Sequence, residues 1–477
     1  MAYALFWSMF GWTMLRRREW ALPLLFCAMS FGAFSVLPPA ATGGITILPR
    51  TLCAVALLAV VLLERDGLSR AWTFMTDPRR LGLLTAFMVM AVIISLFMPR
   101  LFAGHVTIMG LNSTQPELLK PSMTIYTQII YLTASYCVAL AVSLIGTTPE
   151  GRRTIANAVI LGTLCAVFTG VLDVATHGTN LLAPFRTATY RLLLVGEILG
   201  SSRIVGLMPE ASAYGGLCAG FGTAAYFIGR VIPAEGWWGK LARIAPFMAL
   251  GMAALSTSSS AYLGLGMFCV VAGLDWVIRF MRATEPQERR TLFRECAIVV
   301  TLLFVVGLVA LLNSKAFAPA YRMIDLMVFH KSQSASYIER STWNLVSLRA
   351  LAETYWLGVG VGSTRSSSWP VALVSGTGVL GGALMAAFLL RFLSASTSKD
   401  ADRVSRQILY GAKLSWLVVF IPGAVSSPSV DFGAMSASLF GMAAAVMGTD
   451  GVRAIRDRRR KPLARRDIRQ PLARTGA

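Results

Sequence analysis

The chain has 477 residues, of which 55% are hydrophobic and 14% charged, and its mean hydropathy is +0.63. These values indicate an integral membrane protein with no separable soluble domain. The formal net charge of +21 would suggest a nucleic-acid partner in a soluble protein. In a membrane protein, basic cytoplasmic loops and anionic lipid headgroups account for it, so we expect membrane lipids and no nucleic acid as partners.

Apolar stretches recur along the whole chain. A hydrocarbon core of roughly 30 Å takes about 20 helical residues per crossing, and about twelve stretches approach that length. In chain order they are residues 20–38, 46–63, 81–98, 124–146, 154–176, 211–229, 244–255, 261–280, 295–312, 369–390, 414–427 and 430–448. The seventh and eleventh are short, so we expect them to be tilted, partly re-entrant or differently bounded. The pattern predicts an all-α polytopic membrane protein.

Lys and Arg residues fall on alternate loops. Roughly 32 of the 44 basic residues lie in segments that share one predicted side, and short basic loops stay in the cytoplasm. These segments are residues 16–18, 64–80, 147–153, 230–243, 279–294, 391–413 and the chain from 449 onward. We therefore expect an N-terminal interfacial or cytoplasmic segment (1–19), a transmembrane domain (20–448) and a basic cytoplasmic tail (449–477), with both termini in the cytoplasm.

The outward loops carry the candidate chemistry. Three of them are long, at residues 99–123, 177–210 and 313–368, and the last exceeds what a connection needs. Basic residues are disfavoured on this side, so the cations found there indicate an anionic ligand. The three histidines are spread over the three loops and the seven cysteines lie within predicted spans, so the spacing predicts neither a metal site nor a disulfide framework.

One outward loop ends in the stretch R-I-V-G-L-M-P-E-A-S, from Arg203 to Ser212. Pro209 at the first position of the next span, with Glu210 beside it, is typical of a helix start. Proline lacks the N–H that would be unsatisfied there, and a carboxylate suits the positive end of a helix. Glu210 also lies near Arg203 at the mouth of a span, where a buried carboxylate is placed to accept a proton.

The largest outward loop contains a second candidate, residues 337–356, whose pattern predicts an amphipathic helix. At about 100° per residue, Arg340 and Asn344 share one polar stripe, whereas Arg349 faces nearly the opposite way. Arg349 is placed to pair with Glu353 one turn later. We therefore interpret Arg349 as structural and Arg340 as the anion-binding residue.

This helix runs into a glycine-rich turn, G-V-G-V-G-S-T-R at residues 358–365. No Lys-Ser/Thr closes it and no predicted strand precedes it, so it fits neither a P-loop nor a dinucleotide fold. Its backbone N–H groups and Arg365 predict a phosphate-binding turn, with a flexible hinge as the alternative. Trp343 is placed to stack on a sugar, with an interfacial anchor as the alternative.

Three stretches taken together carry a resemblance to a known family: residues 203–212, the polar corner S-T-S-S-S at 256–260, and residues 340–368 with R-x-x-W and G-V-G-V-G-S. In these the chain resembles the Wzy-type polysaccharide repeat-unit polymerases, which are related to the O-antigen ligases. The resemblance implies a GT-C-like glycosyltransferase of a bacterial inner membrane with its active site facing the periplasm. It also implies an undecaprenyl-diphosphate-linked oligosaccharide as substrate, a chain-length regulator protein as a partner, and no metal or other cofactor.

We therefore expect a polymerase that joins lipid-linked repeat units into a capsule, exopolysaccharide or O-antigen chain. Arg203 and Arg340 are expected to bind the diphosphates, and Glu210 to take the proton of the acceptor hydroxyl, with His330 as the alternative base. Further substrate-binding residues are expected to be Arg191, Arg365, Asn344, His330 and Trp343.

Two alternatives stay open. An O-antigen ligase would transfer polysaccharide to lipid A core, but ligases typically show a His-Asn-like pair shortly after the glycine-rich turn. This chain has T-R-S-S-S-W at 364–369, which favours the polymerase. A transporter of lipid-linked oligosaccharide should carry ionisable residues deep within several spans, whereas here the charges gather at the outer face.

Overall fold

The computed structural model describes residues 2–111, 113, 115–190, 192–193, 197–198, 201–312 and 335–447. The protein is mostly helical (72%) and has almost no sheet, which confirms the expected all-α class. Its strands form two small antiparallel hairpins, β1 (Thr107–Met109) with β2 (Pro116–Leu118) and β3 (Glu197–Ile198) with β4 (Ser201–Ser202).

The helices follow one another along the chain and run back and forth across the molecule. Their bounds are α1 (Ala2–Arg16), α2 (Ala21–Ala28), α3 (Pro49–Leu62), α4 (Gly67–Thr76), α5 (Gly82–Leu101), α6 (Met123–Ile145), α7 (Pro149–Ala175), α8 (Ala211–Ile228), α9 (Gly236–Leu255), α10 (Ser259–Arg282), α11 (Pro286–Leu312), α13 (Ala335–Glu353), α14 (Trp369–Ser394), α15 (Arg403–Ser426) and α16 (Gly433–Val446). Short 3₁₀ helices add turns at Arg18–Trp20, Pro39–Ala41, Ala183–Phe185 and Gly229–Val231.

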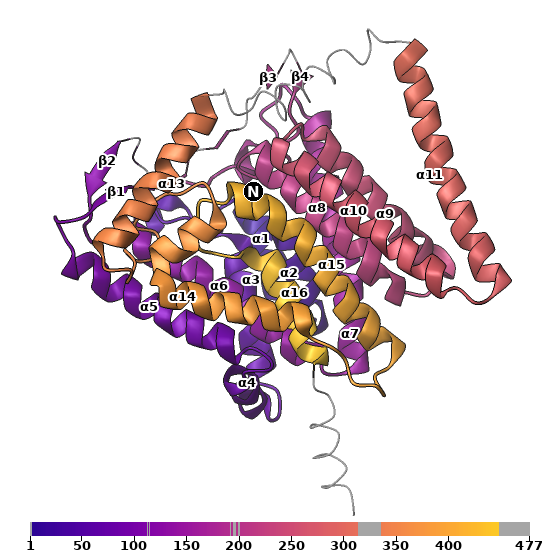
Figure 1. Ribbon diagram of the computed structural model, residues 1–477, viewed down its shortest axis with the longest axis horizontal. Coiled ribbons are helices and arrows are strands. Elements are labelled where there is room, and N and C mark those ends of the chain that lie inside the picture. The colour runs from indigo at the N-terminus through magenta and orange to yellow at the C-terminus, as the bar shows by residue number, and fades with distance from the viewer. Residues whose placement is uncertain are drawn as a thin grey trace, which may run out of the picture.

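The connections sort onto two ends of the helix bundle. The loop end holds the long connections, which are the described residues of 29–48, 102–122, 176–210, 354–368 and 427–432. The basic end holds α4, the basic helix ends and the short connections, among them residues 229–235, 283–285 and 395–402. Figure 1 shows the two hairpins of the loop end in the upper part of the molecule and α4 at the bottom. This arrangement follows the alternation of basic segments in the sequence.

Six helices are long and apolar enough to cross a membrane: α5, α6, α7, α10, α14 and α15. Two shorter apolar helices, α3 and α16, have 14 residues each. Within the described residues the expectation of 12 spans is therefore not confirmed. The first predicted span differs most, because its helix α2 has only 8 residues and the chain continues as turns.

Burial against other helices explains part of this difference. α8 packs against α7, α9, α10 and α15, and most of its side chains are buried. Similarly, α16 is buried from Ala434 to Val446, where it packs on α6 and α15. A helix that neighbouring helices shield from lipid does not need the length or the hydropathy of a lipid-facing span.

Several helices begin earlier than the hydropathy pattern predicts, α9 and α15 among them. α9 begins at Gly236 instead of near residue 244, and α15 begins at Arg403 instead of near residue 414. Both added stretches carry basic side chains. The apolar stems of such side chains lie along a helix while their charged groups reach water. Hydropathy alone therefore placed these two boundaries too far along the chain.

The N-terminal helix α1 packs on residues 34–36 of the loop end, whereas the charge pattern placed the N-terminal segment on the opposite, basic side. The indole N–H of Trp7 donates to the carbonyl of Val36 at 2.9 Å, and the rings of Tyr3 and Phe34 lie 5.5 Å apart. The expected basic tail, residues 449–477, lies outside the described residues.

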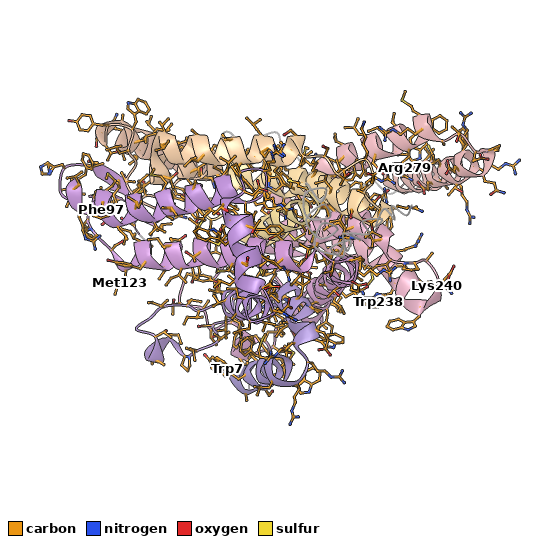
Figure 2. All side chains as sticks on the ribbon, turned by 90° about the horizontal axis from the view of Figure 1, so that it is seen from below. Trp7, Phe97, Met123, Trp238, Lys240 and Arg279 are labelled. Carbon is orange, nitrogen blue, oxygen red and sulfur yellow. The ribbon has the colours of Figure 1, made fainter. Side chains whose placement is uncertain are left out.

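Different helices form the two sides of the bundle. Seen from below, Phe97 of α5 and Met123 of α6 lie on one side, and Lys240 of α9 and Arg279 of α10 lie on the other (Figure 2). The same separation is visible in Figure 1, where α5 and α13 lie on the left and α8, α9 and α10 on the right. The loop end therefore has two flanks that belong to different helices.

Candidate active site

The stretch that leads into α8 is fixed to the end of α7 by one carboxylate. Asp173 Oδ2 accepts hydrogen bonds from the backbone N–H groups of Val205 at 2.8 Å and Gly206 at 3.0 Å. Arg186 donates from Nη2 to Asp173 Oδ1 at 2.5 Å and to the carbonyl of Gly206 at 2.9 Å. Because an ionised acceptor makes strong hydrogen bonds, this network gives residues 203–210 a defined place beside α7.

Gly206 is required by this loop conformation. Its φ of +58° lies in the left-handed region, and a Cβ atom there would lie 2.8 Å from Cε2 of Tyr214. Tyr214 is fully buried and donates its hydroxyl to the carbonyl of Ala166 at 3.0 Å, so the ring has little room to move. The glycine of the sequence motif thus lets the loop pack closely on α8.

Glu210 precedes α8 as its N-cap residue. The helix begins at Ala211, so the expectation that Pro209 occupies the first helical position is wrong. The carbonyl of Pro209 accepts the N–H of Leu193 at 2.8 Å, which keeps this proline in the extended loop. The carboxylate of Glu210 does not cap the helix backbone and instead accepts a hydrogen bond from the hydroxyl of Ser212. It thus lies at the positive end of the α8 dipole, where a carboxylate is favourably placed.

Arg203 lies half-buried beside Glu210. Burial lowers the pKa of Arg203, and the nearby carboxylate of Glu210 opposes that shift, as does Tyr262 at the start of α10. Within the described part of the chain, Arg203 Nε is buried and has no hydrogen-bond partner. A buried donor left without a partner costs about 1–3 kcal/mol. The site therefore keeps an unused guanidinium donor next to a carboxylate.

The polar corner at 256–260 joins α9 to α10 beside this group. Ser256 packs against Gly215 in the first turns of α8, and Thr257 adopts a φ of +48°. The hydroxyl of Thr257 is buried and has no hydrogen-bond partner among the described residues. Two of the three stretches that carry the family resemblance thus meet at the head of α8. We call this group the Arg203 site; its members are Arg203, Glu210, Ser212, Tyr262 and residues 256–260.

The glycine-rich turn does not form the phosphate cradle expected from its sequence. Its backbone N–H groups at Gly358, Val359, Gly360 and Val361 donate, in that order, to Thr354 Oγ1 at 3.2 Å, the Ser375 carbonyl at 2.8 Å, the Gly376 carbonyl at 3.1 Å and Ser95 Oγ at 2.9 Å. The turn lies buried along α14. Packing against α14 and α5, together with the hydroxyl of Thr354, therefore uses these four donors that a phosphate would need.

α13 confirms a helix in the largest loop, but not the expected amphipathic pattern: its polar stripe faces the protein, and the apolar side chains of Ile338, Leu345 and Leu348 are exposed. Asn344 Oδ1 accepts the N–H of Ser367 at 2.8 Å, and the carbonyl of Arg340 accepts the Ser367 hydroxyl at 3.1 Å. The hydroxyls of Ser347 and Thr364 lie 3.0 Å apart. The stripe thus serves to dock α13 on the segment after the glycine-rich turn.

Arg365 stacks on Trp343, with its Cζ atom 3.7 Å from the ring centroid. The tryptophan is only 8% exposed, so little of its ring is left for a sugar. Arg349 is exposed on the other face of α13, as expected. Its predicted ion pair with Glu353 is wrong, because Glu353 instead accepts the N–H of Thr107 in β1 at 3.3 Å. We call Arg340, Trp343, Asn344 and Arg365 the α13 group.

The expected site residues fall into two groups instead of one. Arg203 and Glu210 lie together, whereas Arg340 belongs to α13, which packs on α14 and β1. Figure 1 shows α13 on the left flank of the loop end and α8 with α10 on the right. Arg191 and His330 lie outside the described residues.

One ionisable residue at the loop end, Asp431, escaped the sequence prediction. Asp431, which precedes α16, accepts the N–H of Gly433 at 2.9 Å and a hydrogen bond from Ser135, and the positive charge of Arg50 lies near it. Arg50 also lies near Tyr190. Burial raises the pKa of Tyr190 to about 12, and the positive charge of Arg50 opposes that shift. Asp431 is the one acidic residue in the predicted span 430–448. An ionisable residue in such a span is itself a signal of function.

The described residues form no candidate metal site. Among the described residues, no group of three or more His, Cys, Asp or Glu side chains is placed to hold a metal ion.

A scan against protein-family models, a search of curated proteins and a search of solved structures each found no match to this chain. Its function must therefore be argued from its own residues and geometry.

Proposed function

We propose that this protein is a polysaccharide polymerase that joins undecaprenyl-diphosphate-linked oligosaccharide repeat units into a capsule, exopolysaccharide or O-antigen chain. In this proposal the loop end faces the periplasm of a bacterial inner membrane, because basic helix ends and short basic loops stay in the cytoplasm. The apolar helices support a substrate with a prenyl anchor, which needs a bilayer to reach the site.

The observation that carries the proposal is the unused guanidinium donor of Arg203 beside the carboxylate of Glu210. A guanidinium suits a diphosphate because its planar fork meets two phosphate oxygens and stays charged at any working pH. A carboxylate at the same place supplies a proton acceptor. Asp173 holds the backbone between them, so the two groups are positioned before substrate arrives.

In the proposed reaction, a hydroxyl of the acceptor sugar attacks the anomeric carbon of the donor. The new glycosidic bond forms as the bond from that carbon to the diphosphate oxygen breaks, and the lipid diphosphate leaves with the bonding electron pair. Arg203 stabilises the negative charge that develops on the leaving oxygen. Glu210 takes the proton of the hydroxyl and later releases it to water.

Arg340 is proposed to bind the diphosphate of the second lipid-linked chain. It is half-buried at the same end of the bundle, and its side chain forms no ion pair within the described residues. Two lipid diphosphates must be held for chain extension, and two separated cationic groups meet that need. The expected substrate-binding roles of Arg191 and His330 stay predictions, because both residues lie outside the described part of the chain.

The experiment uses purified protein in nanodiscs supplied with a lipid-linked repeat unit, and it measures chain extension. Glu210→Gln should lower the rate about a hundredfold or more, because a general base is lost. If Glu210 only stabilises the start of α8, the same change should cost at most about 1 kcal/mol of helix stability and leave the rate largely intact. Near-normal extension would therefore remove the base assignment and favour His330.

A matched control is Glu117→Gln, because Glu117 is a carboxylate on β2 at the same end and pairs with Lys120 at 3.4 Å. It should extend chains at the normal rate. Two results would change the assigned class. Product that forms only when lipid A core is added would indicate a ligase. Movement of the intact lipid-linked sugar across a vesicle membrane, without a new bond, would indicate a transporter.

A further inference from the structure

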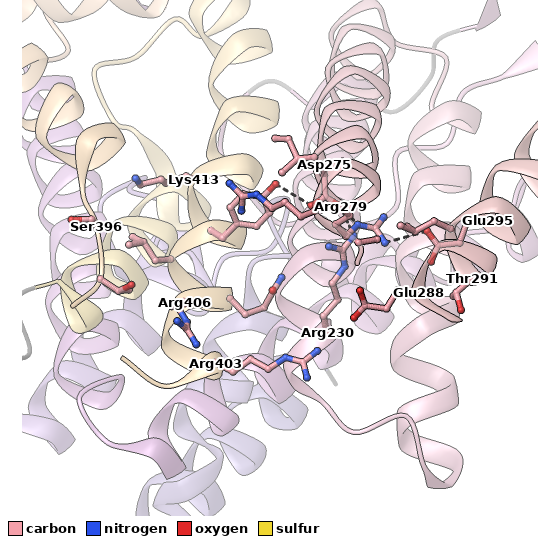
Figure 3. A pocket seen from close by; sticks show the side chains of 18 residues that line it. Arg230, Asp275, Arg279, Glu288, Thr291, Glu295, Ser396, Arg403, Arg406 and Lys413 are labelled. Carbon is pink, nitrogen blue, oxygen red and sulfur yellow. Dashed lines mark hydrogen bonds and ion pairs between the residues drawn. The ribbon is translucent and has the colours of Figure 1, made fainter. Parts of the chain in front are cut away.

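A pocket of about 880 Å³ opens at the basic end, between the end of α10, the start of α11 and the start of α15 (Figure 3). Six basic and three acidic side chains line it, so the lining has a net charge of +3. The basic residues are Arg230, Arg279, Arg282, Arg403, Arg406 and Lys413. A concave surface with an excess of one charge concentrates ions of the opposite sign. The pocket lies at the far end of the bundle from the Arg203 site.

Asp275 organises one wall of this pocket. It is 2% exposed and accepts hydrogen bonds from Arg230 at 2.9 Å, Arg279 at 3.0 Å and the hydroxyl of Tyr410 at 2.9 Å. Arg279 also pairs with Glu295 of α11 at 3.2 Å, and Figure 3 shows these contacts. A buried charge must be well satisfied to offset its desolvation. The network therefore holds α10, α11 and α15 in a defined arrangement around the pocket.

Four of the basic side chains remain without a counter-charge. Within the described chain, no ion pair engages Arg282, Arg403, Arg406 or Lys413. Figure 3 shows Arg403 and Arg406 together on the first turns of α15, facing the pocket from below. Membrane topology needs Lys and Arg near this surface, but it does not need them gathered around a cavity. Their arrangement is that of a site for an anion.

The helix beside the pocket presents an apolar surface outward. Leu274, Val277 and Met281 of α10 are exposed, and α10 is one of the six helices able to cross a membrane. In a bilayer this surface contacts acyl chains. An amphiphile with a phosphate headgroup fits both features, since its head meets the cations and its chains lie along α10.

We propose that this pocket binds the phosphate headgroup of an anionic membrane lipid in the leaflet at the basic end. The site is separate from the polymerase reaction and does not depend on it. The guanidinium forks of Arg403 and Arg406 hold phosphate oxygens, and Lys413 adds a point charge. A lipid bound there connects α10 with α15, and its binding stabilises the folded bundle more as the lipid concentration rises above the Kd.

The test uses the full chain purified in detergent and titrated with phosphatidylglycerol, with the retained lipid measured by native mass spectrometry. In Arg403→Gln/Arg406→Gln the phosphatidylglycerol affinity should fall about thirtyfold, because two cations near a membrane surface are removed. Phosphatidylcholine, which has no net charge, should bind weakly to both proteins. Inorganic phosphate, added alone in a parallel titration, separates a lipid site from a site for a free anion.

The control is Arg65→Gln/Arg79→Gln, which removes two exposed arginines at the same end but away from the pocket. Its phosphatidylglycerol affinity should stay within about threefold of the original. Equal losses in both variants would overturn the proposal in favour of diffuse attraction to the basic end. Phosphate that displaces the lipid at equal concentration would overturn the lipid assignment. Thermal unfolding without lipid should be the same in all three proteins, because the changed side chains are exposed.

Discussion

Two stretches at the loop end combine glycine, arginine and serine ahead of a helix, yet they use their hydrogen-bond donors differently. In residues 358–368 four consecutive N–H groups bind protein oxygens, and Arg365 stacks on Trp343. In residues 203–212 the loop is also anchored, but Nε of Arg203 has no partner in the described chain. An anion site needs donors that folding leaves unused. The glycine-rich turn also keeps one buried donor without a partner among the described residues, the hydroxyl of Ser363, whereas the loop ahead of α8 keeps one on a guanidinium, which carries the charge that an anion needs.

The largest effect should come from Arg203. Arg203→Ala should slow chain extension about a hundredfold to a thousandfold, or about 3–4 kcal/mol in the barrier, because a positioned donor to the developing charge is lost. Arg203→Lys should recover only part of the rate, since a point charge cannot reproduce the bidentate fork. The measurement is extension of a lipid-linked repeat in nanodiscs at equal protein amounts.

Arg349 provides the matched control for Arg203, because it is an exposed arginine at the loop end with no ion pair among the described residues. Arg349→Ala should extend chains at the normal rate. If Arg203→Ala kept normal extension, or if both variants lost activity equally, the contrast between the two stretches would have no catalytic meaning.

A substitution in the glycine-rich turn should instead lower the stability of the protein. Gly360 has a φ of +91°, and a Cβ atom there would lie 3.0 Å from Pro99 Cγ and 3.1 Å from Ser95 Cα. Gly360→Ala should therefore destabilise the protein by about 2–3 kcal/mol, from backbone strain and overpacking together. Thermal unfolding in detergent measures this loss, and the rate per folded molecule should stay close to normal.

Gly104→Ala separates the two causes, because Gly104 has a φ of +76° but open space where the Cβ would lie. It should show the strain alone, about 1 kcal/mol. A Gly360→Ala protein of normal thermal stability that no longer extends chains would place the glycine-rich turn in substrate binding and reverse the comparison.

The sequence predicted helices best where hydropathy and charge agree. α5, α6 and α7 lie close to the expected spans, because a helix that crosses the hydrocarbon core must be apolar along most of its length. α2 is shorter than its apolar stretch because the chain after it pairs with a distant loop, as when Ala33 donates its N–H to the carbonyl of Leu207 at 2.8 Å. Such long-range pairing leaves no period in the local sequence.

The candidate site, too, could be predicted only where its residues are close together in the sequence. Arg203 and Glu210 are near neighbours in the chain, so their proximity could be predicted. The carboxylate that anchors them comes from Asp173 on α7, and Tyr262 comes from α10, which no local pattern indicates. The glycine-rich turn was misinterpreted because the acceptors of its N–H groups, such as the Ser375 carbonyl, lie on another helix.

The smallest effect should come from Arg365, whose guanidinium lies on the ring of Trp343. If this contact is structural, Arg365→Ala should lower stability by about 0.5–1 kcal/mol, the range of a partly exposed cation–π pair, and leave chain extension nearly unchanged. A double-mutant cycle with Trp343→Leu isolates the pair, since the ring and the guanidinium are removed separately and together.

The cycle also decides between the two roles of Arg365. A coupling energy of about 0.5–1 kcal/mol in thermal unfolding, with little change in rate, is expected if stacking is its function. If Arg365 instead binds a diphosphate, Arg365→Ala should slow chain extension about a hundredfold. Trp343→Leu keeps the charge of Arg365 and should therefore extend chains faster than Arg365→Ala does. In that case the α13 group would share the catalytic role of the Arg203 site, because both flanks of the loop end would then bind substrate phosphate.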